Sequence, residues 1–269
     1  MTMRIIRSVC LGIFLLIAIG PLGWLVISSL KTNRDFFATP FGFPEVWQLQ
    51  NYSIVFSSVS FGRYFANSIF TAIGSITLTL IAVLMAAYIL TFRFRGKAFW
   101  IGFATVGILI PTNAFMVPYY YIINWIGLYD SLIGLSLVYT GMMLPFTFLI
   151  IKNYMDTVPH ELREAAYIDG ASIHVTFIRV IVPVSMPSIV TASIFLFINA
   201  WNELLFANLL TQSESTRTLQ VAVRHFLSSF FSDYPKAFAA MAITIIPTVI
   251  VYSLLSERII GGLTAGAVK

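Results

Sequence analysis

The chain has 269 residues, of which 58% are hydrophobic and 10% are charged, and its mean hydropathy is +0.88. Soluble domains contain about 45–50% apolar and about 25% charged residues, so this composition excludes an ordinary water-soluble domain. It also excludes a disordered chain, which needs low hydrophobicity and high charge. The net charge of +5 comes from 16 basic residues dispersed between apolar stretches, which form no continuous basic patch for nucleic acid.

Apolar stretches long enough to cross a bilayer, about 20 residues each, recur six times. They cover residues 9–30, 64–92, 98–123, 131–151, 184–209 and 237–257. The first stretch follows two arginines and has no small-residue cleavage site, so we expect a retained helix rather than a cleaved signal. The sequence therefore predicts an all-α membrane protein, with residues 1–269 forming a single domain of six transmembrane helices.

The distribution of Lys and Arg predicts the orientation of these spans, because cytoplasmic loops carry the excess of positive charge. Ten basic residues fall on the side of the two ends: Arg4, Arg7, Arg93, Arg95, Lys97, Lys152, Arg163, Arg179, Arg258 and Lys269. Six fall on the other side: Lys31, Arg34, Arg63, Arg217, Arg224 and Lys236. We therefore expect cytoplasmic N- and C-termini, a cytoplasmic loop over residues 152–183, and external segments over residues 31–63 and 210–236.

The cytoplasmic loop carries signals for two short helices. Pro159 suits the first turn of a helix, and Gly170 suits its end, where a left-handed backbone conformation is needed. Ser172 is a suitable N-cap for a second amphipathic helix that runs toward Pro183. The loop is therefore predicted to be structured rather than irregular.

The first of these helices has one small, mostly apolar face, formed by Leu162, Ala165, Ala166 and Asp169 at spacings of three and four residues. Small side chains allow another surface to approach closely, and the flanking Arg163 and Glu164 are placed to pair with that surface. We expect the face to dock on a cytoplasmic protein. The alternative is a helix that rests on lipid head groups.

The loop resembles the EAA loop of ABC importer permeases, whose pattern is E-A-A-x3-G-x9-I-x-L-P. The matching residues are Glu164-Ala165-Ala166, Gly170 and Val180-Ile181-Val182-Pro183, with valine in place of isoleucine and leucine at two positions. The resemblance to the carbohydrate-uptake branch extends over nearly the whole chain, through Asn51-Tyr52, Asn67-Ser68, Trp201-Asn202-Glu203 and the segment 262–269. Within that branch the chain is similar to the maltose-type second permease.

This resemblance implies a type I ABC importer permease fold and a non-catalytic subunit of the bacterial cytoplasmic membrane. The implied partners are a second homologous permease, two ATPase subunits and an extracellular solute-binding protein. A coupling helix would dock on the ATPase through Glu164, Ala165, Ala166, Asp169 and Gly170. ATP and Mg would bind to the ATPase subunits, because this chain has no phosphate-binding G-x-x-x-x-G-K-[ST] sequence, and no cofactor of its own is expected.

The resemblance also implies that the cargo is a sugar. A di- or oligosaccharide is the expected substrate, while a polyol or glycerol phosphate stays open. The external segments 31–63 and 210–236 are expected to contact the solute-binding protein or else simply to cap the spans.

Polar residues within apolar spans are costly unless they face protein or water, so they indicate a pathway. In the fifth span Asn199, Asn202, Glu203 and Phe206 fall on one helical stripe beside Trp201. Amide and carboxylate groups bind sugar hydroxyls, and aromatic rings cover the apolar sugar face, so these five residues are predicted to line a translocation pathway. The alternative for Glu203 is a structural role, bonded to a neighbouring helix or to water.

The third span contains two prolines, Pro111 and Pro118, with Asn113 between them. Prolines kink membrane helices and free carbonyl groups, so Asn113 is a candidate pathway residue, with a packing kink as the alternative. Pro145 in the fourth span is open to the same two interpretations. Residues 119–121, three tyrosines, are typical of an aromatic belt at the membrane interface.

Two other classes of protein fit less well. A secondary transporter would use intramembrane acids or histidines as relays, and Glu203 alone is available. A membrane enzyme would need clustered His, Asp or Glu, whereas His160, His174 and His225 are scattered and Cys10 is the single cysteine, so no metal site is expected.

Overall fold

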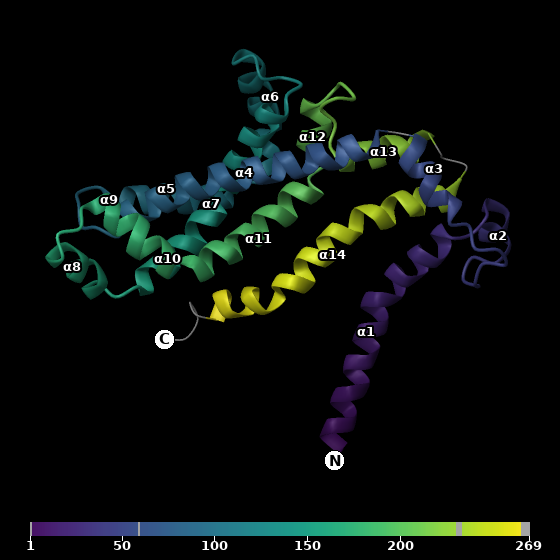
Figure 1. Cartoon of the computed structure of the whole chain (residues 1–269), viewed down its shortest axis with the longest axis horizontal. Helices are drawn as coiled ribbons and strands as arrows, with labels where there is room; N and C mark the ends of the chain where they lie inside the picture. The colour runs from purple at the N-terminus through teal and green to yellow at the C-terminus, as the bar shows by residue number, and fades with distance from the viewer. Residues whose placement is uncertain (1, 59, 230–232, 265–269) are drawn as a thin grey trace. The chain divides into compact units, whose positions relative to one another are not determined.

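The computed structural model describes residues 2–58, 60–229 and 233–264, and all regular secondary structure in these ranges is helical (Figure 1). The predicted all-α fold is therefore confirmed. The helices are α1 (Thr2–Ser29), α2 (Asn33–Ala38), α3 (Gln50–Ser58), α4 (Phe61–Ile89), α5 (Lys97–Leu109), η1 (Thr112–Phe115), α6 (Met116–Trp125), α7 (Leu132–Thr157), α8 (Glu161–Ile168), α9 (Ile173–Thr176), η2 (Phe177–Ile181), α10 (Val182–Val184), α11 (Met186–Asn202), α12 (Leu205–Leu210), α13 (Leu219–Ser229) and α14 (Tyr234–Thr264).

Within the described residues, four helices are long and apolar enough to cross a membrane: α1, α4, α7 and α14. Two bent pairs satisfy the same test together. One joins α5 to η1 and α6 with a bend of 96°, and the other joins residues 173–184 to α11 with a bend of 73°. Counting each pair as one span gives six spans, the predicted number, although the second pair begins at Ile173, within the segment expected to be a cytoplasmic loop.

The third and fifth spans differ from the continuous helices expected over 98–123 and 184–209. The third is divided at Pro111, and Ile110 before it has an extended backbone, because a proline ring disfavours the helical conformation of the preceding residue. The fifth bends at Ser185, between α10 and α11, and α11 ends at Asn202, because Glu203 has an extended backbone. By contrast, α7 runs unbroken through Pro145 and continues to Thr157, six residues beyond the expected end of the span.

The described chain divides into two compact units, residues 1–64 with 219–247, and residues 65–218 with 248–269. An aromatic cluster connects three helices of the first unit. The ring of Trp24 in α1 lies 6.2 Å from Phe36 in α2 and 5.2 Å from Phe238 in α14. Phe36 also stacks on Tyr234 at 5.5 Å. These contacts hold the end of α1 against the segment that follows it.

The buried Lys31 forms hydrogen bonds within the segment that follows α1, residues 31–51. The Lys31 ammonium donates hydrogen bonds to the carbonyl oxygens of Thr39 and Pro40. The amide of Asn51 in α3 donates to the carbonyl oxygens of Ser29 and Lys31, at 2.8 and 3.0 Å. A buried charge needs such acceptors, so residues 31–51 form a built structure rather than a loose loop.

The second unit contains the core that supports the predicted coupling loop. Buried side chains from α4, α7, η2 and α11 form this core, and they include Val83, Tyr88, Ile151, Met155, Ile181 and Ala192. Helices α8, α9 and α10 lie together at one end of this unit (Figure 1). The loop is therefore continuous with a packed core.

Candidate functional site

The first helix of the EAA loop (residues 152–183) is α8, which begins at Glu161, two residues after Pro159, and ends before Gly170 as the sequence predicts. After α8 the Gly170 backbone has φ +80°, the Ala171 N–H donates to the Ala166 carbonyl at 2.9 Å, and the Gly170 N–H donates to the Tyr167 carbonyl at 3.0 Å. These two bonds form a Schellman motif, which requires a left-handed residue at Gly170. The Ser172 hydroxyl then accepts from the Val175 N–H and begins α9.

The five predicted coupling residues lie on one short, accessible element. Glu164, Ala165, Asp169 and Gly170 are exposed, and Ala166 is half-buried. No atom of this chain lies within 4 Å of the position that a Cβ of Gly170 would take. Beside them Ile168 is 86% exposed, an apolar side chain that the spacing argument did not single out. Leu162 and Tyr167 of the same helix are each 40% exposed, so α8 leaves three large apolar side chains accessible in this chain.

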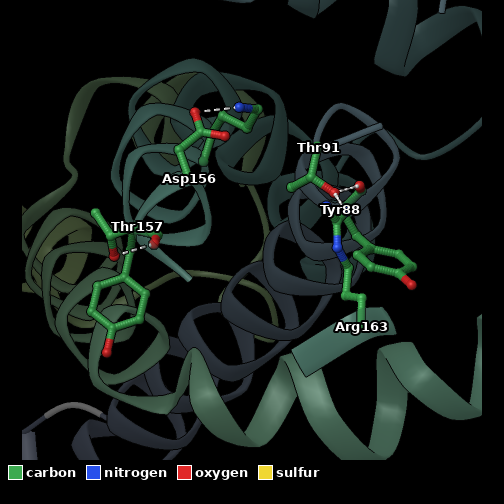
Figure 2. Close-up of polar contacts among 7 residues, drawn as sticks. Tyr88, Thr91, Asp156, Thr157 and Arg163 are labelled. Atoms are coloured by element: carbon green, nitrogen blue, oxygen red, sulfur yellow. Dashed lines mark hydrogen bonds and ion pairs between the residues drawn. The ribbon is translucent and has the colours of Figure 1, made fainter. Parts of the chain in front are cut away.

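Arg163 faces this chain rather than a partner (Figure 2). Its guanidinium donates to the Thr91 hydroxyl at 2.5 Å and lies 5.0 Å from the centre of the Phe92 ring. The Thr91 hydroxyl in turn donates to the Tyr88 carbonyl at 2.7 Å. Arg163 also contacts the His160 ring. A charge-assisted hydrogen bond and a cation–π contact therefore connect α8 to the end of α4.

Tyr88 provides a second connection between α4 and the EAA loop. Its buried ring stacks on Phe177 at 5.0 Å, and its hydroxyl lies 3.4 Å from the Tyr167 hydroxyl and 3.5 Å from the Ile173 carbonyl. One side chain of a spanning helix thus contacts both helices of the loop. Sequence reasoning missed Tyr88 and Thr91, because they precede the motif by more than 70 residues and carry no local signal.

The end of α7 enters the same region. Lys152 is buried and forms an ion pair with Asp156 one turn later, and the Thr157 hydroxyl donates to the Tyr154 carbonyl (Figure 2). The ion pair provides the buried Lys152 ammonium with the partner that a buried charge needs. Because these residues are helical, the irregular part of the EAA loop begins only at Val158.

The structure brings two predicted pathway elements to one cavity. A cavity of about 270 Å³ is lined by Asn199 of α11, by Thr112 of η1 and by Pro145 and Phe146 of α7. Asn113 follows Thr112 and is exposed at the break of the third span. Of the polar residues at this break, Thr112 shares the cavity with Asn199, whereas the predicted pathway residue Asn113 does not line it.

The fifth-span stripe, Asn199, Trp201, Asn202, Glu203 and Phe206, does not form a single helical face, because α11 ends at Asn202. Asn199 and Asn202 are exposed, and each amide donates to a carbonyl of its own helix. Trp201 and Phe206 are buried. Asn202 does not line the cavity that Asn199 lines.

Glu203 caps the helix that follows it. One carboxylate oxygen accepts the Phe206 N–H at 2.8 Å, and the other accepts the Ala207 N–H at 2.9 Å and the Tyr139 hydroxyl at 2.8 Å. These contacts satisfy free N–H groups of the first turn of α12 and so stabilise the break between α11 and α12. The carboxylate is bonded to a neighbouring helix, as the structural alternative expects.

The segment 211–218 is held by two side chains that the sequence did not mark for this role. The Asp130 carboxylate accepts the Thr216 hydroxyl and the N–H groups of Gln212 and Ser213. Burial opposes ionisation, but these hydrogen bonds more than offset it and lower the pKa of Asp130 to about 2.

Asn67 holds the other half of this segment. Its amide donates to the carbonyl oxygens of Ser215 and Arg217, both at 2.9 Å. Residues 211–218 are therefore shaped by contacts from α4 and from the α6–α7 turn. As for metals, no group of three or more His, Cys, Asp or Glu in the described part of the chain is placed to hold an ion.

Residues 78–263 match the sequence profile of the family described as "Binding-protein-dependent transport system inner membrane component". The trehalose transport system permease protein SugB of Mycobacterium tuberculosis is 36% identical over 94% of this chain and 93% of its own length. The diacetylchitobiose uptake system permease protein NgcG of Streptomyces coelicolor is 30% identical over 94% and 85%. The inner membrane ABC transporter permease protein YcjP of Escherichia coli is 31% identical over 96% and 94%.

The fold matches a chain in the crystal structure of a bacterial ABC transporter involved in the import of the acidic polysaccharide alginate. The TM-score is 0.84, with 24% identity over 95% of this chain and 96% of that chain. The profile match, the long alignments and the helical architecture agree with one another. The chain is a multi-pass inner-membrane permease and belongs to the family of binding-protein-dependent transport system inner membrane components.

Proposed function

We propose that this chain is one permease subunit of an ATP-driven importer that carries a di- or oligosaccharide across the bacterial cytoplasmic membrane. The observation that carries this proposal is the exposed α8, which ends in a defined motif at Gly170 and is bonded to a spanning helix through Arg163. Relatives named for trehalose and diacetylchitobiose transport support the sugar class.

The EAA loop transmits movement between an ATPase subunit and the spans. Glu164, Ala165, Ala166, Asp169 and Gly170 form the docking surface, where small side chains allow close approach. Ile168 supplies an apolar anchor of the kind that stabilises protein interfaces. Because Arg163 and Tyr88 connect the loop to α4, displacement of α8 pulls on α4 rather than bending the loop.

The complete transporter contains a second homologous permease, two ATPase subunits and an extracellular solute-binding protein, with the termini of this chain in the cytoplasm. The shaped segment 211–218 supports an external docking surface, because preformed loops bind with a smaller entropy cost. The segment 31–63 is a second candidate surface. Apolar side chains of α1 are exposed within its unit, so lipid or the second permease covers them.

The pathway runs past the break of the third span. Asn113 and Asn199 are the proposed hydrogen-bonding contacts for sugar hydroxyls, supported by the cavity that Thr112 and Asn199 share. Asn202 is a further proposed polar contact. Trp201, Glu203 and Phe206 act on the pathway by holding the α11–α12 break in position.

The test is ATPase activity of the complete complex in proteoliposomes, measured with its binding protein over a panel of disaccharides, oligosaccharides, polyols and glycerol phosphate. We expect stimulation by one di- or oligosaccharide, with matching uptake. Stimulation by glycerol phosphate alone would contradict the sugar class. Reporter fusions at the C-terminus test the orientation, and activity of a periplasm-dependent reporter there would contradict it.

A further inference from the structure

A large apolar pocket lies in the second unit between α4, α5 and α7, and extends from the turn after α4 to Phe115. Its volume is about 650 Å³, within the range of about 300–1,000 Å³ that is usual for ligand sites. Residues of α4, α5 and α7 line it, and every lining side chain is apolar. The predicted pathway residues Asn113, Asn199 and those within 201–206, and the coupling residues, do not line this pocket, although Pro145 lines both it and the cavity of about 270 Å³.

The pocket follows the two spanning helices inward from the turn that joins them. Phe94 in this turn lines it, and so do the residues of α5 from Trp100 to Gly107, a distance of about 10 Å at 1.5 Å per residue. Phe103, which also lines it, is 67% exposed, so the pocket opens on the surface of the unit. A long, narrow apolar ligand fits this shape better than a folded domain does.

The same turn carries three cations, Arg93, Arg95 and Lys97, which alternate with a pocket-lining residue. Gly96 has φ +89° and is followed at once by α5, so the chain reverses between α4 and α5, and the three cations lie within three residues of the pocket-lining Phe94. In the described part of the chain these cations form no ion pair. Their charge is therefore available to an external anion.

We propose that this pocket and the 93–97 turn form a binding site for an anionic phospholipid, with the phosphate on the three cations and an acyl chain in the pocket. The charge complementarity selects an anionic lipid, because each Lys or Arg near a membrane surface adds about 1 kcal/mol of attraction to anionic lipid. The apolar lining provides the other half of an amphipathic match. The site requires that α4 and α5 lie in the membrane, and α4 alone and α5 together with α6 are long and apolar enough to cross it.

The site adjoins the anchor of the EAA loop. Thr91 and Phe92, which hold Arg163, immediately precede Arg93. A headgroup bound at the turn restricts the segment to which α8 is attached. Occupancy of the site therefore favours transmission of movement between α8 and α4.

The test is native mass spectrometry of the full chain, purified in detergent within its transporter complex, titrated with dioleoylphosphatidylglycerol. Combining Arg93→Gln, Arg95→Gln and Lys97→Gln should weaken retention of this lipid about tenfold or more. The matched control combines Arg34→Gln, Arg63→Gln and Arg224→Gln, three exposed cations elsewhere, and should leave retention unchanged. Equal losses in both triple variants would overturn the proposal.

If the triple variant fails to assemble, three other measurements still test the proposal: a variant in the pocket, a neutral lipid, and competition by inorganic phosphate. Ala86→Leu narrows the pocket and should weaken lipid retention about fivefold or more, whereas Ala66→Leu on the exposed surface of α4 should not. Dioleoylphosphatidylcholine should bind much more weakly than the anionic lipid. Inorganic phosphate at equal concentration should not displace the lipid.

Results contrary to these expectations would indicate that something other than an anionic phospholipid binds the pocket. Equal binding of the two lipids would indicate a merely apolar surface, and displacement by inorganic phosphate would indicate a free-anion site. A photoreactive residue at position 103 should crosslink to lipid. Crosslinking to the second permease instead would show that protein covers the pocket, and each of these three results would overturn the proposal.

Discussion

The spacing of residues along the sequence predicts both the EAA loop and the fifth-span stripe. In the structure, the predicted residues share one element in the loop but not in the stripe. In the loop the predicted residues stay on one accessible element, from Glu164 to Gly170. In the stripe they separate, because α11 ends at Asn202 and Glu203 turns its carboxylate onto the next helix. Helical spacing predicts a shared face only where nothing interrupts the helix.

The cause of the difference is the range over which each feature is determined. The ends of α8 are set by Gly170 and Ser172, which act on backbone groups within a few residues. The break at Glu203 depends also on Tyr139, which is 64 residues away in the sequence. A carboxylate within a span finds partners inside the chain because lipid offers none, so polarity there indicates structure as readily as transport.

The largest effect is expected from Glu203→Ala. It leaves the Tyr139 hydroxyl and two N–H groups of α12 without their acceptor, and each unsatisfied group costs about 1–3 kcal/mol, so we expect a loss of about 3 kcal/mol or more. Thermal unfolding in detergent and the amount of protein in the membrane measure this loss. Glu203→Gln keeps an acceptor oxygen and should lose less.

The matched control for this prediction is Glu214→Ala, which removes an exposed carboxylate from the segment 211–218. It should change the unfolding temperature little. If the variants at 203 and 214 unfold at the same temperature, the Glu203 carboxylate does not stabilise the α11–α12 break. The interpretation of Glu203 as a pathway residue would then be favoured over the structural one.

The next effect is expected at Gly170. Valine in a left-handed conformation costs about 1–2 kcal/mol or more, so Gly170→Val should unwind the end of α8 and reduce sugar uptake, while basal ATPase activity persists. Asparagine tolerates this conformation, so Gly170→Asn should retain most of the uptake. Equal losses in both variants would show that the ATPase, and not the backbone, requires glycine here.

Much of the fold follows from the composition and the length of the apolar stretches, since six stretches of spanning length leave few alternatives to a helical membrane protein. The breaks at Pro111 and Glu203 could not be placed with equal certainty. Proline is tolerated within α7 at Pro145 and interrupts the third span at Pro111. Neighbouring helices decide whether the freed backbone groups find partners.

The residues of the candidate site also fall into two groups, those that the sequence predicts and those that only the folded structure identifies. The coupling residues were found because their spacing is local and matches a family pattern. The residues that attach them to the spans, Tyr88 and Thr91, lie in another helix and become visible only when the chain is folded. Asp130 is similar, because its role depends on a segment more than 80 residues later.

A smaller effect is expected from breaking the contact between α8 and α4. Arg163→Met and Thr91→Val each remove one partner of the same hydrogen bond, and a double-mutant cycle should give a coupling energy of about 1 kcal/mol. The number of ATP molecules hydrolysed per sugar should rise in either variant, with no further rise in the double variant. Additive changes would mean that the two side chains act independently.

The smallest effect on stability, and the most selective effect on transport, is expected from the two asparagines of the stripe. Both are exposed and bonded to their own helix, so Asn199→Ala and Asn202→Ala should change the free energy of unfolding by less than about 0.5 kcal/mol. Asn199 lines the cavity with Thr112 whereas Asn202 does not, so the KM for sugar should rise more in Asn199→Ala. A larger rise in Asn202→Ala would mean that sugar passes closer to the end of α11 at Asn202 than to the cavity that Asn199 lines.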